Sequence, residues 1–331
     1  MNTENKKPAP LYKLGSHGDE VRQIQHGLWN LGYYKGHVDG KFGGHTESSV
    51  RNLQRDNGLA VDGIVGPDTW KKIFGDNDIP FPKLISKPLP YRCLALSGTF
   101  ETGLAIPECF SGISGDFDGQ GMSLGILQWN FGKGTLQTLL LELLENERHI
   151  AESIFHDRFE TLLKVLCSDK QELMKFVRSI QHPAMHSIYE PWKGMFKALG
   201  RNERFREIQV KHAAEEYKTA LALCRDYGLW SERAVALMFD IIVQNGGIPH
   251  LTKLRIMKKF KPLSEQLSFD ELEVMKMRII ANIRAEASEQ IWVEDVRARK
   301  LCCANGGGSV HGIGYDIGAQ FGIGLRRIEG F

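Results

Sequence analysis

Apolar residues recur at helical spacing along most of the chain. In the stretch 19–32 the apolar positions are three, four and three residues apart and share one helix face: Val21, Ile24, Leu28 and Leu31. Comparable patterns predict further helices over residues 45–58, 68–74, 137–155, 157–180, 202–228, 231–248, 268–287 and 291–303. Strand signals are few. The sequence therefore predicts a mainly α protein with one small hairpin near residues 116–128.

A short pattern occurs twice in the first quarter of the chain. VDGKFGGHT at 38–46 returns as VDGIVGPDT at 61–69, 23 residues later. Each copy has an Asp-Gly turn, an apolar residue, a glycine and then a threonine, Thr46 or Thr69, that can cap the following helix. With the helix that precedes the first copy, the repeat predicts a small three-helix domain over residues 11–75.

The segments around this domain differ in composition. Residues 1–10 are rich in Asn, Lys and Pro and are expected to be a disordered lead. Residues 76–90 hold four prolines and are expected to form an extended linker. The second domain would then run over 91–331, with the glycine-rich stretch 305–325 as a lining loop or a terminal turn.

Composition narrows the class of protein. A net charge of +2 over 331 residues does not indicate a strongly basic nucleic-acid binder. No apolar run is long enough to span a membrane, and the N-terminus lacks a secretory h-region, so we expect synthesis in the cytoplasm. The six cysteines form no C-x-x-C pair and the histidines no H-E-x-x-H motif, so we expect mostly free thiols, no metal and no cofactor. We also expect a monomer.

The repeat domain resembles a known wall-binding module. Its doubled D-G-x-x-G-x-x-T and its opening LGSHGDEVRQIQ at 14–25 are similar to the peptidoglycan-binding domain found beside many cell-wall hydrolases. The resemblance implies peptidoglycan as the partner. We expect the groove between the helices to use Tyr33, Tyr34 and Phe42.

Carboxylates suited to glycoside hydrolysis follow the linker. Glu101 lies in the mostly uncharged stretch SGTFETGLAIP, and Asp116 and Asp118 follow 15 and 17 residues later in a glycine-rich loop. A glycosidase needs one carboxyl that stays protonated, which desolvation favours, and a second that stays ionised in a wetter place. We therefore expect Glu101 to be buried and the loop aspartate to be solvated.

This region resembles the chitosanases of the lysozyme-like superfamily. Their Glu is followed 17 or 18 residues later by D-G-R-G-x-T-x-G, which here is DGQGMSLG at 118–125; DIIVQNGG at 240–247 resembles a later helix of the family. SLGILQ at 123–128 also looks like a motif of goose-type lysozymes and lytic transglycosylases. The resemblance implies a two-lobed helical domain, with Glu101 as general acid, Asp118 as general base and Ser123 orienting the water. Such an inverting pair expects carboxyls roughly 6.5–9.5 Å apart.

Two departures from the family favour a different substrate. Gln120 replaces the family's arginine, and Thr135 replaces an acid that meets the amino group of glucosamine. Losing that acid suits an N-acetylated sugar, so we favour a muramidase acting on peptidoglycan. The expected substrate contacts are Asp116, Gln120, Gln128, Asn130 and Thr135, with Asp116 also the alternative base or a turn former.

Other interpretations stay open. A chitosanase, a lytic transglycosylase and a non-catalytic wall-binding protein are the alternatives to a muramidase. A Cys/His amidase built on Cys109 and His311 lacks a local signature, and we expect His311, Tyr315 and Asp240 to be structural. A wall hydrolase without a signal peptide could be a phage endolysin released with a holin. It could equally be an antibacterial effector paired with an immunity protein.

Overall fold

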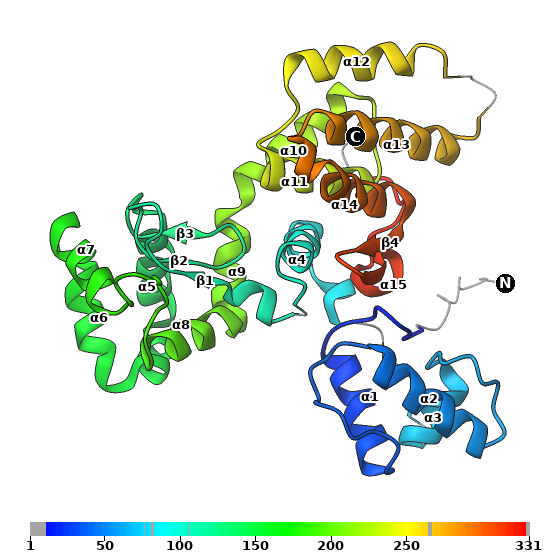
Figure 1. Ribbon diagram of the computed structural model, residues 1–331, viewed down its shortest axis with the longest axis horizontal. Coiled ribbons are helices and arrows are strands. Elements are labelled where there is room, and N and C mark those ends of the chain that lie inside the picture. The colour runs from blue at the N-terminus through cyan, green and yellow to red at the C-terminus, as the bar shows by residue number, and fades with distance from the viewer. Residues whose placement is uncertain (1–10, 76, 81–82, 105, 264–266, 329–331) are drawn as a thin grey trace, which may run out of the picture. The chain divides into compact units, whose positions relative to one another are not determined.

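The computed structural model describes residues 11–75, 77–80, 83–104, 106–263 and 267–328 and is mainly helical (Figure 1). The expected disordered lead, residues 1–10, lies outside the described residues. The chain forms two compact units, Met1–Leu96 with Ala220–Phe331, and Ser97–Thr219. The divisions fall within α4 (Leu89–Thr102) and α10 (Ala214–Asp226). None of the helices in the described ranges is both long and apolar enough to cross a membrane.

Three short helices form the N-terminal part of the first unit. These are α1 (Asp19–Asn30), α2 (Gly44–Asp56) and α3 (Pro67–Phe74). Val21, Ile24 and Leu28 are fully buried, as their spacing predicts. Leu31, expected on the same face, is 47% exposed because the helix ends before it.

Each repeated Asp-Gly turn wraps around a buried glutamine amide. The Gln25 Nε2 donates to Asp39 Oδ1 (2.9 Å) and lies 3.2 Å from Thr46 Oγ1, while its Oε1 accepts the Gly40 N–H (2.9 Å). The second turn repeats this set of contacts with Gln54, Asp62, Gly63 and Thr69. The expectation that Thr46 and Thr69 cap helices is wrong. Glycines occupy the N-cap positions, and the threonines bind the glutamines because a buried amide must be hydrogen-bonded.

The rest of the first unit is built from longer helices. Residues 76–90 were expected to form an extended linker, but they include the short helix η1 (Lys83–Ser86) and the start of α4 (Leu89–Thr102). The nearly all-apolar helix α11 (Glu232–Asn245) is buried as predicted and ends at the left-handed Gly246. The other elements are α10, α12 (His250–Phe260), α13 (Phe269–Glu286), η4 (Gln290–Trp292) and α14 (Val293–Asn305).

The C-terminal glycine-rich stretch is an ordered hairpin followed by a short helix. β4 (Gly307–Val310) pairs antiparallel with β5 (Ile313–Asp316), and α15 (Ile317–Phe321) follows directly. Asp316 caps α15 by accepting the Ala319 N–H (3.0 Å). The segment is therefore regular secondary structure, and not the lining loop or terminal turn that the sequence suggested.

The second unit packs helices against a small sheet. β1 (Ile113–Ser114), β2 (Ser123–Leu124) and β3 (Trp129–Asn130) form a three-stranded antiparallel sheet, so the predicted hairpin has a third strand. The predicted helix 157–180 is interrupted, because the Asp169 side chain accepts the Glu172 N–H and starts a new helix. The helical elements are η2 (Glu108–Ser111), α5 (Thr135–Phe155), η3 (His156–Arg158), α6 (Phe159–Leu166), α7 (Lys170–Ser179), α8 (Trp192–Arg201) and α9 (Glu203–His212).

Candidate active site

Glu101 lies in the last turn of the apolar helix α4. Gly103 ends the helix with a left-handed φ of 62°, and the Thr102 hydroxyl donates to the Gly98 carbonyl (2.8 Å). The Glu101 side chain is exposed. The expectation of a buried Glu101 is therefore wrong: Phe100, directly before it, is fully buried, whereas Glu101 stands where the chain leaves the helix.

Close packing fixes the end of α4 against the small sheet. A Cβ atom at Gly98 would come within 2.7 Å of the Ile126 side chain, so the glycine lets the two segments approach closely without displacing Ile126. Ile126 belongs to the turn between β2 and β3, and it is buried. The last turns of α4 therefore approach the turn between β2 and β3 closely within the second unit.

The two loop aspartates have different environments. Asp116 is 8% exposed; its Oδ1 accepts the Gly121 N–H (2.8 Å), and its own N–H donates to Gln181 Oε1 (2.9 Å). Asp118 is exposed at the tip of the loop, where its Oδ1 accepts the Gln120 N–H (3.0 Å). Asp116 thus holds the loop in shape, and Asp118 presents a carboxylate to solvent.

The remaining predicted site residues lie on or beside the sheet. Ser123 is half-buried on β2, with Ser114 and Asn130 opposite it on the neighbouring strands. Gln120 is half-buried and Gln128 is exposed in a left-handed conformation with φ 53°. The Gln128 side chain spans the turn, accepting from the Ser114 hydroxyl (2.7 Å) and donating to the Gly125 carbonyl (2.8 Å).

Asn130 and Thr135 stabilise the turn that leads into α5. The Asn130 Oδ1 accepts the Lys133 N–H (2.9 Å), and the Thr135 Oγ1 accepts the Asn130 N–H (2.9 Å). Asn130 is 8% exposed, whereas Thr135 is exposed. Both side chains therefore stabilise the turn. From the sequence they were expected to be substrate contacts, and this structural role was not predicted.

The cysteine expected in a rival nucleophilic mechanism is inaccessible. Cys109 is fully buried, and burial raises the pKa of its thiol well above the ordinary value. A thiol held protonated in the core is a poor nucleophile. All six cysteines are free, and of these only Cys167 is exposed.

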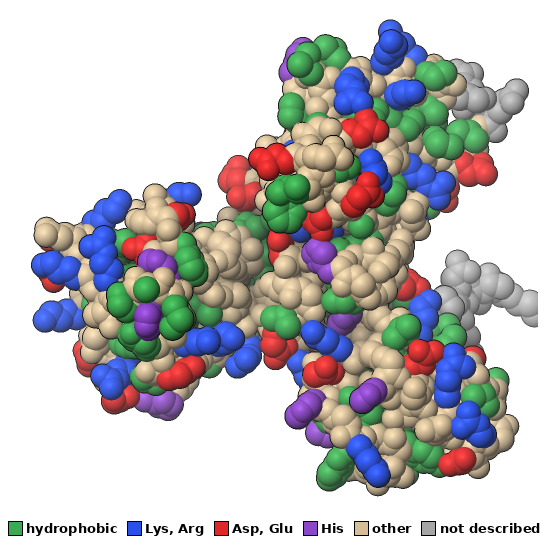
Figure 2. All heavy atoms as spheres, in the orientation of Figure 1, with side chains coloured by type: hydrophobic (Ala, Val, Ile, Leu, Met, Phe, Trp, Pro, Cys, Tyr) green, Lys and Arg blue, Asp and Glu red, His purple; other side chains and the backbone are tan. Residues whose placement is uncertain are grey.

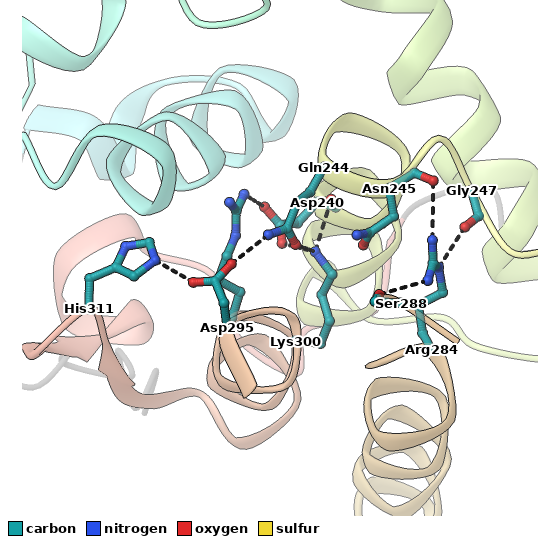
Figure 3. A network of polar contacts seen from close by, with 10 residues as sticks. Asp240, Gln244, Asn245, Gly247, Arg284, Ser288, Asp295, Lys300 and His311 are labelled. Carbon is teal, nitrogen blue, oxygen red and sulfur yellow. Dashed lines mark hydrogen bonds and ion pairs between the residues drawn. The ribbon is translucent and has the colours of Figure 1, made fainter. Parts of the chain in front are cut away.

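A buried charged network stabilises the helices of the first unit (Figure 3). Asp240 on α11 is fully buried and bonds Arg299 (2.6 Å) and Lys300. Burial opposes the charged form of Asp240, but the two cations outweigh it and hold the pKa of Asp240 below its usual range. Asp240 is thus the paired structural acid that its sequence context predicts.

The network continues to the molecular surface. The Lys300 Nζ donates to Gln244 Oε1 (2.6 Å), Gln244 Nε2 donates to Asp295 Oδ2 (2.9 Å), and Asp295 bonds His311. Nearby, the Arg284 guanidinium binds the Gly247 carbonyl (2.9 Å) just beyond the end of α11. His311 therefore serves as a surface partner of this network.

Comparison with known protein families identifies the N-terminal part of the chain. Residues 17–73 match the family model described as a putative peptidoglycan binding domain. This segment is a peptidoglycan-binding domain.

Individual relatives resemble the chain over a similar length. The N-acetylmuramoyl-L-alanine amidase CwlM of Mycobacterium tuberculosis is 46% identical over 66 residues, 20% of this chain and 15% of the amidase. A spore cortex-lytic enzyme of Halalkalibacterium halodurans is 42% identical over 59 residues, 18% of either protein. The chain therefore spans less than a fifth of the length of these relatives.

A solved structure resembles a larger part of the chain. A mutant chitosanase from Bacillus subtilis MY002, complexed with 6 GlcN, is 16% identical with a TM-score of 0.41, covering 67% of this chain and 89% of the chitosanase. A score of this size does not establish a shared fold.

Within the peptidoglycan-binding domain, two of the three expected wall contacts are core residues. Tyr34 is 5% exposed and Phe42 is 1% exposed, so the expectation that they line a surface groove is wrong. Tyr34 can be buried because its hydroxyl donates to the His37 carbonyl (2.8 Å). Tyr33 is half-buried. Trp29 is 59% exposed in the last turn of α1, a position that the helical pattern did not single out.

Proposed function

We propose that the protein is a cell-wall glycoside hydrolase of the muramidase type, which cleaves the bond between N-acetylmuramic acid and N-acetylglucosamine. One observation carries the proposal. The chain contains a peptidoglycan-binding domain and a unit with two exposed carboxylates. Glu101 lies in the last turn of the apolar helix α4, and Asp118 lies at the tip of a glycine-rich loop. The domain supports peptidoglycan as the ligand but does not define the bond that is cleaved.

Glu101 is proposed to be the general acid. It must hold a proton until the leaving oxygen takes it. Because the side chain is exposed without substrate, the bound glycan would supply the desolvation that the free protein does not.

Asp118 is proposed to be the general base, with Ser123 orienting the attacking water. The exposed carboxylate of Asp118 suits a group that must stay ionised, and the Ser123 hydroxyl can both donate to and accept from water. Asp116 holds the loop by its hydrogen bond to Gly121. We therefore assign Asp116 as a positioning residue instead of the base.

The substrate contacts are proposed around this pair. Gln120 and Gln128 lie on the same loop-and-sheet segment, where amides can bind sugar hydroxyls and acetamido groups. Asn130 and Thr135 position that segment through the turn before α5. A threonine at 135 leaves no carboxylate there for a cationic amino sugar, which favours an N-acetylated glycan over chitosan. Release by a holin or by a secretion machine is compatible with this activity.

Product analysis distinguishes this proposal from its alternatives. Purified sacculi are digested with the full-length protein, and the soluble products are identified by mass spectrometry. New reducing N-acetylmuramic acid ends are the expected result. Anhydro-muramic ends would identify a lytic transglycosylase, free stem peptides an amidase, and cleavage of chitosan alone a chitosanase. Sacculus binding without products would identify a non-catalytic wall-binding protein.

A further inference from the structure

Helix α12 has a composition that neither the wall-binding domain nor the candidate site explains. Its sequence from His250 to Phe260 is HLTKLRIMKKF, with four Lys or Arg residues and no acid, and a fifth cation, Lys261, follows directly. The sequence has no Asp or Glu anywhere from 241 to 264. A protein whose net charge is only +2 thus concentrates positive charge on one short helix.

One face of α12 holds the helix to its own unit. Thr252 is 4% exposed and Ile256 is fully buried, and α12 packs along α13. Lys253 Nζ pairs with Asp226 Oδ2 (2.6 Å), and Arg255 pairs with Glu286. These contacts hold the buried face of α12 against its own unit and pair two of the five cations with carboxylates.

The opposite side of α12 combines apolar and basic residues. Leu251, Leu254 and Met257, spaced three residues apart, are 75%, 54% and 38% exposed. Lys258 and Lys261 are exposed on this side, and Lys259 is exposed near the end of the helix on the side of Thr252; within the described ranges none of the three forms an ion pair. The surface over α12 in Figure 2 shows Lys and Arg side chains beside hydrophobic ones.

We propose that α12 docks on the surface of a bilayer containing anionic phospholipids. Helices that lie in a membrane interface combine exposed leucines, which enter the headgroup and acyl boundary, with lysines that meet the anionic headgroups. A soluble polyanion would explain the free lysines but not the exposed leucines beside them. At 11 residues the helix is too short to span a bilayer, so it would lie along the surface. This proposal does not depend on the hydrolase activity.

Vesicle sedimentation tests the docking directly. The full-length protein is mixed with vesicles of phosphatidylglycerol and phosphatidylcholine, or of phosphatidylcholine alone, and we expect binding only to the anionic vesicles. The triple variant K258Q/K259Q/K261Q should bind about a hundredfold more weakly, since each lysine near an anionic surface contributes about fivefold. The variant L251S/L254S should bind at least about tenfold more weakly, because its buried apolar area is lost.

Matched variants separate the helix from overall charge and hydrophobicity. K72Q/K164Q/K170Q removes the same charge from exposed positions outside α12, and L31S/L141S removes two exposed leucines elsewhere. We expect both controls to bind as the wild type does, with unchanged circular dichroism for every variant. Equal binding to both kinds of vesicle would overturn the proposal, as would equal losses in the controls. Anionic binding that L251S/L254S leaves intact, and that soluble polyglutamate abolishes, would overturn it in favour of a polyanion site.

Discussion

Asp116 and Asp118 lie two residues apart on one loop and meet opposite physical conditions. Asp116 is nearly buried and accepts a backbone N–H, whereas Asp118 projects from the tip into solvent. A buried acceptor is costly to lose because its donor is left unsatisfied. The stability of the loop and the proposed chemistry are thus assigned to different carboxylates.

Substitution separates these two tasks. We expect Asp116→Ala to lower the free energy of unfolding by about 1–3 kcal/mol, because the Gly121 N–H loses its partner. Asp116→Asn keeps an oxygen acceptor and should recover most of the loss. Asp118→Ala should change stability by less than about 0.5 kcal/mol but abolish activity. Urea unfolding and sacculus digestion measure the two effects. A stable, inactive Asp116→Ala would contradict the assignment.

The predictions for single residues that proved wrong concern burial: Tyr34 and Phe42 are buried, and Glu101 is exposed. Periodicity identified Val21, Ile24 and Leu28 as core, but it could not show that the Tyr34 hydroxyl has a partner inside the domain. Nor could it show that Glu101 is exposed, although it lies in a mostly uncharged stretch. The Tyr34 hydroxyl bonds the His37 carbonyl only three residues away, but the burial of its ring depends on packing against the other helices of the domain.

At the scale of elements, most helices were predicted from their apolar pattern, but α4, α8 and α12 are among those that were missed. The apolar helix α11 was found, with its end at Gly246, because its pattern and its terminating glycine agree. Helix α12 was not, since its lysines and exposed leucines obscure a single buried stripe. The break before α7 depends on a cap by Asp169, which competes with helix continuation in a way that periodicity does not reveal.

The network around Asp240 predicts how stability responds to pH. We expect Asp240→Asn to lower the free energy of unfolding at pH 7 by about 3–5 kcal/mol, because Arg299 and Lys300 stay buried without their counter-charge. The folded-state pKa of Asp240 is depressed, so its contribution is present above the unfolded pKa near 3.9. The contribution begins to decrease as the pH falls below that value and is lost only as the pH falls through the depressed folded-state pKa.

Urea unfolding at several pH values provides the measurement. The difference between wild type and Asp240→Asn should narrow as the pH drops from 5 to 3. Asp295→Asn, at the more exposed end of the network, should cost less than about 1 kcal/mol and serves as the control. A constant difference across this range would show that the charge of Asp240 is not what stabilises the helices.

At the scale of the whole molecule, the clearest prediction from sequence is the wall-binding domain. Its two repeated turns were visible because the Asp-Gly pairs and threonines recur at fixed positions. The glutamines at the centre of each turn were not recognised, because Gln25 and Gln54 are 29 residues apart while the turns are 23 apart. The candidate site was predicted as a set of residues, but its division into exposed and structural members needed the folded chain.

Two aromatic substitutions test how this domain holds the wall. Phe42→Ala should cost about 3–5 kcal/mol, unfold the small domain and abolish sacculus binding. Tyr33→Ala should leave the domain folded and weaken sacculus binding about fivefold, as loss of an aromatic contact does. Val61→Ala, at another partly exposed position, is the control. Wild-type binding by Tyr33→Ala would exclude Tyr33 as a wall contact.

The release of reducing ends from sacculi by the wild type and Glu101→Gln tests the central claim most directly. Removing a general acid should slow the reaction by about 10²–10⁴-fold, while sacculus binding and the unfolding midpoint stay unchanged. Glu108→Gln, which removes a nearby acid paired with Arg201, is the matched control and should cleave at the wild-type rate. An active Glu101→Gln, or a wild type that binds sacculi and releases no reducing ends, would contradict the account.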